Sequence, residues 1–219
     1  IAYAGYDGKG QARLEPGLSR KDLESKWASI FGDKDIRGTA ILEAIVPFER
    51  ELSVIVARAN NGDLSVYDVV ENIHKDHILS VTHAPASVSK DILKSAQNIA
   101  IKIAEALQVQ GLLAVELFLT RDGNVLVNEL APRPHNSGHW TIDACSTSQF
   151  EQLIRAICGL PLGSSKRWAN AEMVNLIGDE VIDSSRFLDM ENSKLHLYGK
   201  KEVRPGRKMG HATIEKPLT

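Results

Sequence analysis

Two glutamates lie on either side of a turn signal in the middle of the sequence. Glu116 and Glu129 fall in apolar stretches that are typical of strands, and Asp122-Gly123 between them is typical of a two-residue hairpin loop. Such a loop places Glu116 directly opposite Glu129 on the paired strands. The surrounding residues are so apolar that we expect both faces of this hairpin to be buried.

Two facing carboxylates in apolar surroundings repel each other and are costly to bury without compensation. One explanation is structural: Lys or Arg side chains pair with them, or a longer loop makes the alignment accidental. The other is functional, because carboxylates that are distant in the chain but adjacent in space hold Mg²⁺ beside nucleotide phosphates. Asn128 would add a neutral polar ligand or contact. We favour metal-dependent phosphoryl chemistry.

The loop that follows Glu129 is rich in polar groups. Its two prolines stiffen it, and stiff polar loops that leave a strand with metal ligands often orient substrate. A single Arg-Pro pair would be typical of a solvated turn, but here several polar side chains crowd together. They are Arg133, His135, Asn136, Ser137 and His139.

Two further polar segments have both a functional and a structural interpretation. The segment Gly5-Tyr6-Asp7-Gly8-Lys9-Gly10-Gln11 matches neither the Walker A nor the Rossmann pattern. Its backbone N–H groups and Lys9 could bind an anion, although hairpin geometry explains the glycines equally well. A basic cluster near the end of the chain is either a solvated face or a phosphate site. It contains Lys200, Lys201, Arg204, Arg207, Lys208 and His211.

The elements that position these groups can be predicted from capping residues and hydrophobic periodicity. Ser19 and Asp22 resemble a capping pair that opens a helix through Phe31. We expect a second helix over residues 89–109 and a third over about 149–157. Strands are expected over residues 39–46, 51–60, 64–73, 112–120 and 125–131, with a hairpin turn at Asn61-Gly62. Shorter strands, over 173–177, 195–198 and 208–214, follow a linker at 163–166.

Composition limits the class of protein. The chain has 219 residues, of which 43% are hydrophobic and 25% charged, so it is globular rather than disordered. Its net charge of -2 indicates no general attraction to nucleic acid or an anionic membrane, so an anionic substrate would need a local basic pocket. Cys145 and Cys158 are too few for a disulfide framework. We expect both to be buried, reduced thiols, which favours a cytoplasmic location.

Five segments resemble, in order, motifs of the 5-(carboxyamino)imidazole ribonucleotide synthase family, the ATP-grasp carboxylases of purine biosynthesis. They are residues 5–11, residues 43–53, Glu71-Asn72-Ile73-His74, residues 128–139 and Gly206-Arg207-Lys208-Met209-Gly210-His211. The resemblance implies an α+β ATP-grasp fold with antiparallel sheets and helices. The ATP-grasp domain would cover residues 1–163, with its N-terminal part missing. A small β-rich C-terminal subdomain would cover residues 164–219.

The resemblance also implies a reaction. ATP phosphorylates bicarbonate to carboxyphosphate, and 5-aminoimidazole ribonucleotide is carboxylated to its N5-carboxyamino derivative. The implied cofactors are ATP and Mg²⁺, the substrates are small molecules, and the enzyme would be a homodimer without nucleic acid or membrane partners. Another ATP-grasp ligase, such as a formate-dependent glycinamide ribonucleotide transformylase, or a non-catalytic nucleotide-binding fragment remains open.

Site residues are carried over from the resemblance by position. The implied catalytic groups are Asp7, Arg133, His135 and Lys200, and the metal ligands are Glu116 and Glu129. The implied ATP contacts are Gly5, Tyr6, Gly8, Lys9, Gly10, Gln11, Glu43, Val46, Glu51, His74, Asn128 and Glu129. The ribonucleotide contacts are Tyr6, Asp7, Lys9, Asn136, Lys200, Arg207 and Lys208. The chain departs from the family at Ala131, where many ATP-grasp enzymes have an asparagine ligand, and at residues 1–4, where family members have basic residues.

Overall fold

The computed structural model describes residues 11–32 and 39–218, in two compact units that are treated separately: Ile1–Ile45 and Val46–Thr219. The first unit contains helix α1, Arg20–Phe31. Ser19 caps it, and the Ser19 and Asp22 side chains bond reciprocally to each other's backbone N–H, as predicted.

The strand predicted over residues 39–46 is wrong. Residues 39–47 are coil, and the side chains of Ile41, Leu42 and Ile45 are 63% to 83% exposed. An apolar run becomes a strand only where a neighbouring strand satisfies its backbone and a core covers its side chains. Within the described residues, this segment has neither.

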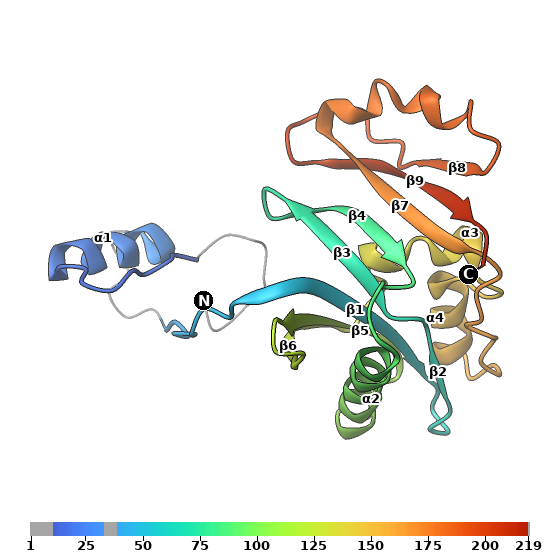
Figure 1. Cartoon of the computed structure of the whole chain (residues 1–219), viewed down its shortest axis with the longest axis horizontal. Helices are drawn as coiled ribbons and strands as arrows, with labels where there is room; N and C mark the ends of the chain where they lie inside the picture. Colours follow the sequence, from blue (N-terminus) through green and yellow to red (C-terminus); the bar gives the residue numbers. More distant parts are fainter. Residues whose placement is uncertain (1–10, 33–38, 219) are drawn as a thin grey trace. The chain divides into compact units, whose positions relative to one another are not determined.

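The second unit is built on one antiparallel sheet with helices on both faces (Figure 1). The strands are β1 Phe48–Arg58, β2 Leu64–Val66, β3 Val70–Lys75, β4 Ile78–Ala84, β5 Gly111–Thr120, β6 Val125–Ala131, β7 Asn170–Ile177, β8 Ser193–Leu197 and β9 Lys208–Lys216. The helices are α2 Lys90–Ala106, α3 Thr141–Ala144 and α4 Gln149–Ile157, with 3-10 turns at Asn136–Gly138, Gly178–Val181 and Ser184–Phe187. The order across the sheet is β6-β5-β1-β3-β4-β7-β9-β8, and β2 pairs with β1. The predicted α+β class is confirmed.

The central strands β1 and β5 are buried on both faces because alternate side chains point to opposite sides of the sheet. Val54 and Val56 of β1 pack in one core, against the alanines of α2. Ile55 and Ala57 pack in the other core, with the Trp140 ring just before α3. Two cores therefore fix β1 and β5 from both sides, and β5 is the strand that carries Glu116.

A hairpin at Asn61-Gly62 is confirmed, but its loop is longer than the two residues predicted, since the Ala59 N–H donates to the Asp63 carbonyl at 2.9 Å. Its return strand is also not continuous. β2 ends at Val66, and β3 begins at Val70 and pairs with an earlier part of β1. Strand β4 was not predicted. It follows a tight turn in which Asp76 and His77 both have positive φ. Asp-His predicts such a turn less strongly than Asn-Gly does.

The turn between β5 and β6 has three residues rather than two. Thr120 and Asn124 close it, with the Thr120 N–H donating to the Asn124 carbonyl at 2.9 Å. Gly123 takes φ +82°, the left-handed conformation that glycine adopts without strain. This longer loop shifts the pairing next to it by one residue, so Leu117 faces Val127.

A β-bulge then shifts the pairing back. Beyond Leu117, the register moves so that Glu116 pairs with Glu129, and Asn128 is the extra residue. The predicted pairing of the two glutamates is therefore confirmed, although the loop length used to derive it is wrong. Without the bulge, Asn128 would face Glu116.

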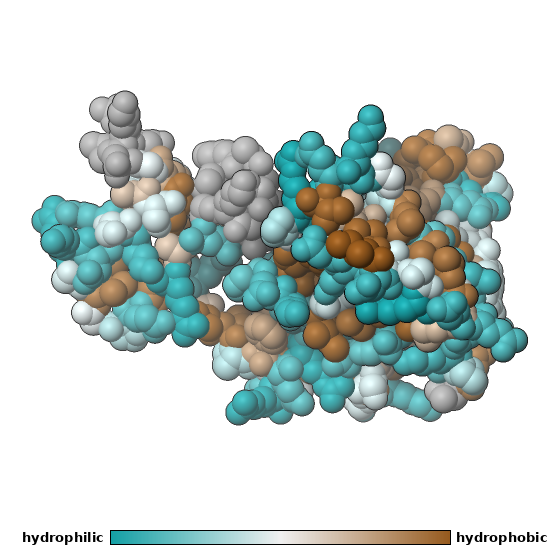
Figure 2. All heavy atoms as spheres, turned by 90° about the horizontal axis from the view of Figure 1, so that it is seen from above, coloured by the Kyte–Doolittle hydropathy of each residue, from teal (hydrophilic) through white to brown (hydrophobic). Residues whose placement is uncertain are grey.

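Burial also differs between the two strands of this hairpin. β5 is buried on both faces as predicted, whereas β6 is the edge strand of the sheet, and its Leu126, Val127 and Leu130 are 40% to 45% exposed. Figure 2 shows apolar side chains at the surface in separate groups among polar ones. The prediction of burial on both faces is thus wrong for β6, which pairs with β5 alone among the described strands.

The last three strands were predicted and continue the same sheet, since β7 pairs with β4. The division of the chain at residue 163 stays a prediction. Cys145 is buried but Cys158 is exposed at the end of α4, so the prediction of two buried thiols is wrong for Cys158. Both are free. None of the described helices is long and apolar enough to cross a membrane.

Candidate active site

The paired glutamates meet a histidine from the polar loop. The ligand atoms of Glu116, Glu129 and His135 all lie within 4.8 Å of one another. His135 Nε2 lies 2.9 Å from Glu116 Oε1. The β5–β6 register brings the two carboxylates together, and the loop after β6 turns back to bring His135 beside them.

The charges of this group push the two carboxyl pKa values apart. Burial raises the pKa of Glu116, but the hydrogen bond from His135 and the electrostatic interactions with His135, His74 and Lys208 outweigh it and hold this pKa below its ordinary value. Burial raises the pKa of Glu129, and the neighbouring charge of Glu116 raises it further. The pair therefore carries negative charge that a bound cation would compensate.

A chain of buried hydrogen bonds holds the His135 ring. The Thr82 hydroxyl donates to Asn72 Oδ1, Asn72 Nδ2 donates to Ser53 Oγ, and Ser53 Oγ donates to Ser137 Oγ, with distances of 2.8 to 2.9 Å. Ser137 Oγ lies 2.8 Å from His135 Nδ1. Because the Ser137 oxygen already accepts a proton from Ser53, its own proton is directed to Nδ1. His135 is then protonated at Nε2, the atom that faces Glu116.

Gln149 fixes the backbone of the same loop from the opposite side. Its side chain is fully buried, accepts a hydrogen bond from the His135 N–H at 2.9 Å and donates to the His135 carbonyl at 2.8 Å. It also lies 2.9 Å from His139 Nδ1. Burial and nearby cations lower the pKa of His139 to about 4, so its neutral ring accepts from Gln149. A Cβ at Gly138 would overlap Ile55 Cδ1, so the loop packs directly on β1.

Two acid–base pairs lie on β1 and β3, which are neighbours in the sheet. Glu51 Oε2 bonds to His74 Nδ1, and Arg50 bonds to Glu71 at 3.1 Å. His74 is also near enough to Glu116 for its charge to act on the Glu116 pKa. The structure therefore brings Glu51 and His74, two of the predicted nucleotide contacts, beside the glutamate pair.

Basic side chains face the glutamates from the end of the chain. Burial lowers the pKa of Lys208, and the charges of Arg133 and Lys200 lower it further, while Glu116 opposes them. Lys200 Nζ donates to the Lys208 carbonyl at 2.6 Å. Arg207, in contrast, bonds to the Glu202 carbonyl, and nothing in the described residues joins it to this group. Arg133, Lys200 and Lys208 thus form a positive region beside the acidic pair.

Asn136 has a buried amide with no hydrogen-bond partner on either its Oδ1 or its Nδ2 in the described parts of the chain. Unsatisfied buried amides are rare, and a ligand would satisfy this one. Asn128, the extra residue of the bulge, is exposed beside Glu129. Both positions agree with a binding role.

The remaining predicted residues lie in other parts of the chain. Gln11 and Glu43 lie in the separately described first unit, and Val46 lies in coil before β1. The others lie outside the described residues: Gly5, Tyr6, Asp7, Gly8, Lys9 and Gly10.

Sequence reasoning missed Ser53, Asn72, Thr82 and Gln149 as parts of the site. Ser53 follows the ion-pairing residues of β1, and Asn72 lies within a recognised motif, but nothing in the sequence says that the two strands are neighbours. A polar residue inside an apolar strand was the available signal.

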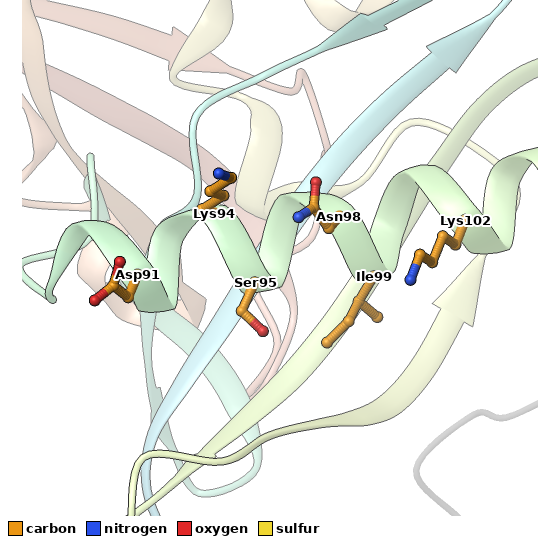
Figure 3. A pocket seen from close by; sticks show the side chains of 6 residues that line it. All are labelled: Asp91, Lys94, Ser95, Asn98, Ile99 and Lys102. Atoms are coloured by element: carbon orange, nitrogen blue, oxygen red, sulfur yellow. The ribbon is translucent and has the colours of Figure 1, made fainter.

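The hollow shown in Figure 3 contains none of these groups. Its lining comes from Asp91, Lys94, Ser95, Asn98, Ile99 and Lys102, all on α2. Side chains from a single helix diverge from its axis rather than converge on a ligand, so we assign no function to this hollow.

Comparison with known proteins shows what the chain resembles. The ATP-grasp domain model matches residues 2–150, and the phosphoribosylaminoimidazole carboxylase C-terminal domain model matches residues 171–217. The chain is 48% identical over 219 residues to an N5-carboxyaminoimidazole ribonucleotide synthase of Brucella melitensis, covering 100% of this chain and 59% of the relative.

Solved structures of such synthases are also similar to this chain. The ADP complex of an N5-carboxyaminoimidazole ribonucleotide synthetase superposes with a TM-score of 0.87 at 44% identity, covering 98% of this chain and 55% of that one. An Aspergillus clavatus synthase in complex with ADP and 5-aminoimidazole ribonucleotide gives a TM-score of 0.75 at 38% identity, covering 78% and 47%. The chain spans little more than half the length of the curated relatives that it matches.

Proposed function

The chain belongs to the ATP-grasp family, and from that premise we propose that it carboxylates 5-aminoimidazole ribonucleotide in purine biosynthesis. ATP and bicarbonate are the proposed co-substrates, ADP and phosphate the co-products, and carboxyphosphate the intermediate. The similarity to synthases of this kind along the whole chain supports the proposal. The Aspergillus clavatus protein binds both ADP and the aminoimidazole ribonucleotide, which supports the choice of substrates.

One structural observation carries the proposal: Glu116 and Glu129 face each other across the β5–β6 ladder with His135 in contact. A pair of carboxylates with no paired Lys or Arg at ion-pair distance in the described residues fits a hard divalent cation. We propose that Glu116 and Glu129 hold Mg²⁺. When bound, Mg²⁺ would neutralise phosphate charge during phosphoryl transfer.

We propose that basic side chains of the chain bind the anionic substrates. The positive region formed by Arg133, Lys200 and Lys208 is placed to bind bicarbonate and the ribonucleotide phosphate, because two anions must approach each other there. His135 holds its proton at Nε2 and donates a hydrogen bond to Glu116. It can donate that hydrogen bond to an anionic substrate oxygen instead. Glu51 and His74 are placed to contact the nucleotide.

A substrate-dependence assay tests this function. We expect phosphate release from ATP to require both bicarbonate and 5-aminoimidazole ribonucleotide, and not to occur with formate and glycinamide ribonucleotide. Glu129→Gln keeps the shape but removes the charge, and should abolish turnover. Glu105→Gln, at an exposed position on α2, is the matched control and should leave turnover unchanged. Full turnover in Glu129→Gln would refute the metal assignment.

Two further proposals, on oligomeric state and on location, accompany this function. A homodimer is proposed from the resemblance alone, and light scattering in solution tests it. A cytoplasmic location is proposed because Cys145 and Cys158 are both free thiols, and cell fractionation tests it.

A further inference from the structure

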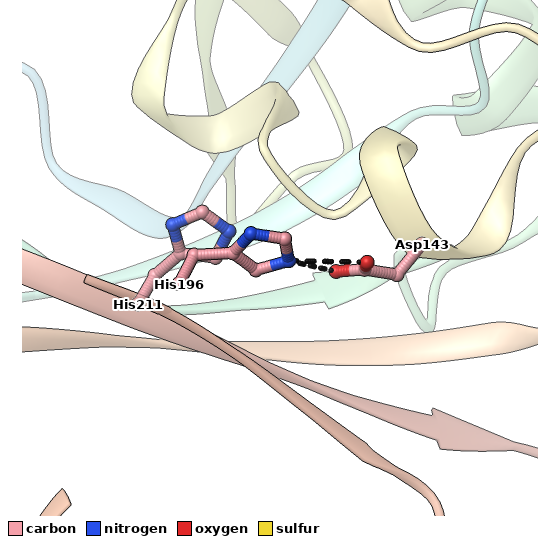
Figure 4. A group of neighbouring side chains, drawn as sticks. All are labelled: Asp143, His196 and His211. Carbon is pink, nitrogen blue, oxygen red and sulfur yellow. Dashed lines mark hydrogen bonds and ion pairs between the residues drawn. The ribbon is translucent and has the colours of Figure 1, made fainter. Parts of the chain in front are cut away.

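A second group of potential metal ligands lies away from the glutamate pair. It consists of Asp143, His196 and His211, whose ligand atoms all lie within 4.8 Å of one another. His196 and His211 are directly paired on β8 and β9, and Asp143 comes from α3. The two imidazoles are stacked with their ring centroids 4.5 Å apart, and in Figure 4 the Asp143 carboxylate faces the edge of the His196 ring.

The distance between His196 and Asp143 is close to that between two ligands of one metal ion. His196 Nε2 lies 2.9 Å from Asp143 Oδ2 and 3.1 Å from Oδ1. A tetrahedral site with metal–ligand bonds of about 2.0 to 2.1 Å separates its ligand atoms by about 3.3 Å. A cation could therefore replace the proton between this imidazole and carboxylate with shifts of a few tenths of an ångström, and that proton would leave to solvent.

His211 supplies an independent observation. Its side chain is 1% exposed, and its Nε2 is buried with no hydrogen-bond partner among the described residues. The other ring nitrogen, Nδ1, lies 2.8 Å from the Tyr198 hydroxyl. A hydrogen bond at one ring nitrogen orients the imidazole and leaves the other nitrogen for a metal. A buried nitrogen without a partner is otherwise a cost to the fold.

From this geometry we propose that Asp143, His196 and His211 form a zinc site. Two imidazoles and one carboxylate suit Zn²⁺, whereas Mg²⁺ prefers oxygen ligands alone. Three protein ligands leave a fourth position for water. The site is distinct from the glutamate pair in donor set and does not depend on the proposed function.

Zinc here would link elements that flank the candidate active site. Asp143 follows the polar loop by a few residues, β8 and β9 bound the segment that carries Lys200, and Lys208 is the first residue of β9. Bound metal would tie α3 to these two strands and stabilise the folded chain, because the unfolded chain lacks the preformed site.

The test is zinc binding by the full chain after removal of metals with a chelator and in the presence of excess Mg²⁺. Isothermal titration should show one Zn²⁺ per chain at this site, and Zn²⁺ should raise the melting temperature. His196→Asn and Asp143→Asn should each weaken this binding at least about tenfold and abolish the thermal shift. His77→Asn is the matched control, because His77 is exposed in a turn with positive φ that asparagine tolerates.

Circular dichroism establishes that each variant is folded, and two variants are used so that failure of one to fold leaves the other. Loss of zinc in His196→Asn or Asp143→Asn but not in His77→Asn supports the site. Equal zinc binding in wild type and His196→Asn overturns it, as does the absence of zinc binding. Zinc that is lost only in Glu129→Gln also overturns it, since the metal would then occupy the glutamate pair.

Discussion

Replacing Gln149 with methionine should impair the candidate active site, although we assign Gln149 no contact with a substrate. Methionine keeps the length of the buried side chain but removes its amide. The His135 N–H then loses its partner, and so does His139 Nδ1, while the His135 carbonyl keeps its hydrogen bond from the Gly138 N–H. A polar group left unsatisfied costs about 1–3 kcal/mol, so loss of the partner of the His135 N–H alone predicts a loss of about 1–3 kcal/mol in the free energy of unfolding.

The same helix offers a matched control. Gln152 is also fully buried on α4, and its side chain makes two equivalent bonds to the backbone of Gly163, at 2.7 and 2.8 Å. Gln152→Met likewise leaves one backbone N–H, that of Gly163, unsatisfied, while the Gly163 carbonyl keeps its hydrogen bond from the Ser65 hydroxyl, so it should destabilise the chain by a similar amount. Gly163, however, lies outside the polar loop that carries His135.

Urea unfolding measures the loss of stability. Steady-state phosphate release, below the unfolding transition, measures the effect on catalysis. Gln149→Met should lower kcat/KM for bicarbonate by about 10- to 100-fold, because His135 loses its fixed position. Gln152→Met should change it by no more than about twofold, since destabilisation alone does not alter the folded site. Equal kinetic losses in the two variants, or none in Gln149→Met, would show that Gln149 does not position His135.

Three further predictions follow from the geometry. Ser137→Ala should convert the imidazole of His135 from the Nε2–H form to a mixture of tautomers in ¹⁵N NMR spectra, and an unchanged spectrum would contradict the proposed chain of hydrogen bonds. In the native chain, Cys158 should react with iodoacetamide, whereas Cys145, whose burial raises its pKa to about 12, should react only after unfolding; equal rates would be inconsistent with the structure. Ser89→Ala should lower the free energy of unfolding by about 1 kcal/mol through loss of the α2 cap, and no change in the urea midpoint would argue against that cap.

The sequence predicts local structure well where a local signal decides it. The caps at Ser19 and Ser89, the turn at Asn61-Gly62 and the β5–β6 hairpin depend on neighbouring residues, and all are present. The prediction fails at residues 39–46, where strand formation depends on a partner strand that no local pattern reveals.

The glutamate pair shows how a correct prediction can come from incomplete reasoning. The three-residue turn and the bulge at Asn128 each shift the register by one residue, and the two shifts cancel. Neither shift has a clear sequence signal, since Asp122-Gly123 suits both loop lengths. The pairing can be predicted because carboxylates in apolar strands are conspicuous.

The residues that hold the polar loop in place could not be predicted in the same way. Ser53, Asn72 and Thr82 form a chain only because β1, β3 and β4 are adjacent in the sheet. Gln149 reaches the polar loop across a turn and a short helix. Such contacts depend on tertiary packing, which a single sequence does not specify.

We propose that this chain activates bicarbonate by phosphorylation, and oxygen transfer tests that proposal most directly. Turnover of ATP and 5-aminoimidazole ribonucleotide with [¹⁸O]bicarbonate should yield inorganic phosphate that carries an ¹⁸O atom. The bicarbonate oxygen that attacks the γ-phosphorus remains on phosphate when the carboxyl carbon is captured. Mass spectrometry of the phosphate decides the question: labelled phosphate agrees with carboxyphosphate formation, and unlabelled phosphate released during turnover contradicts it.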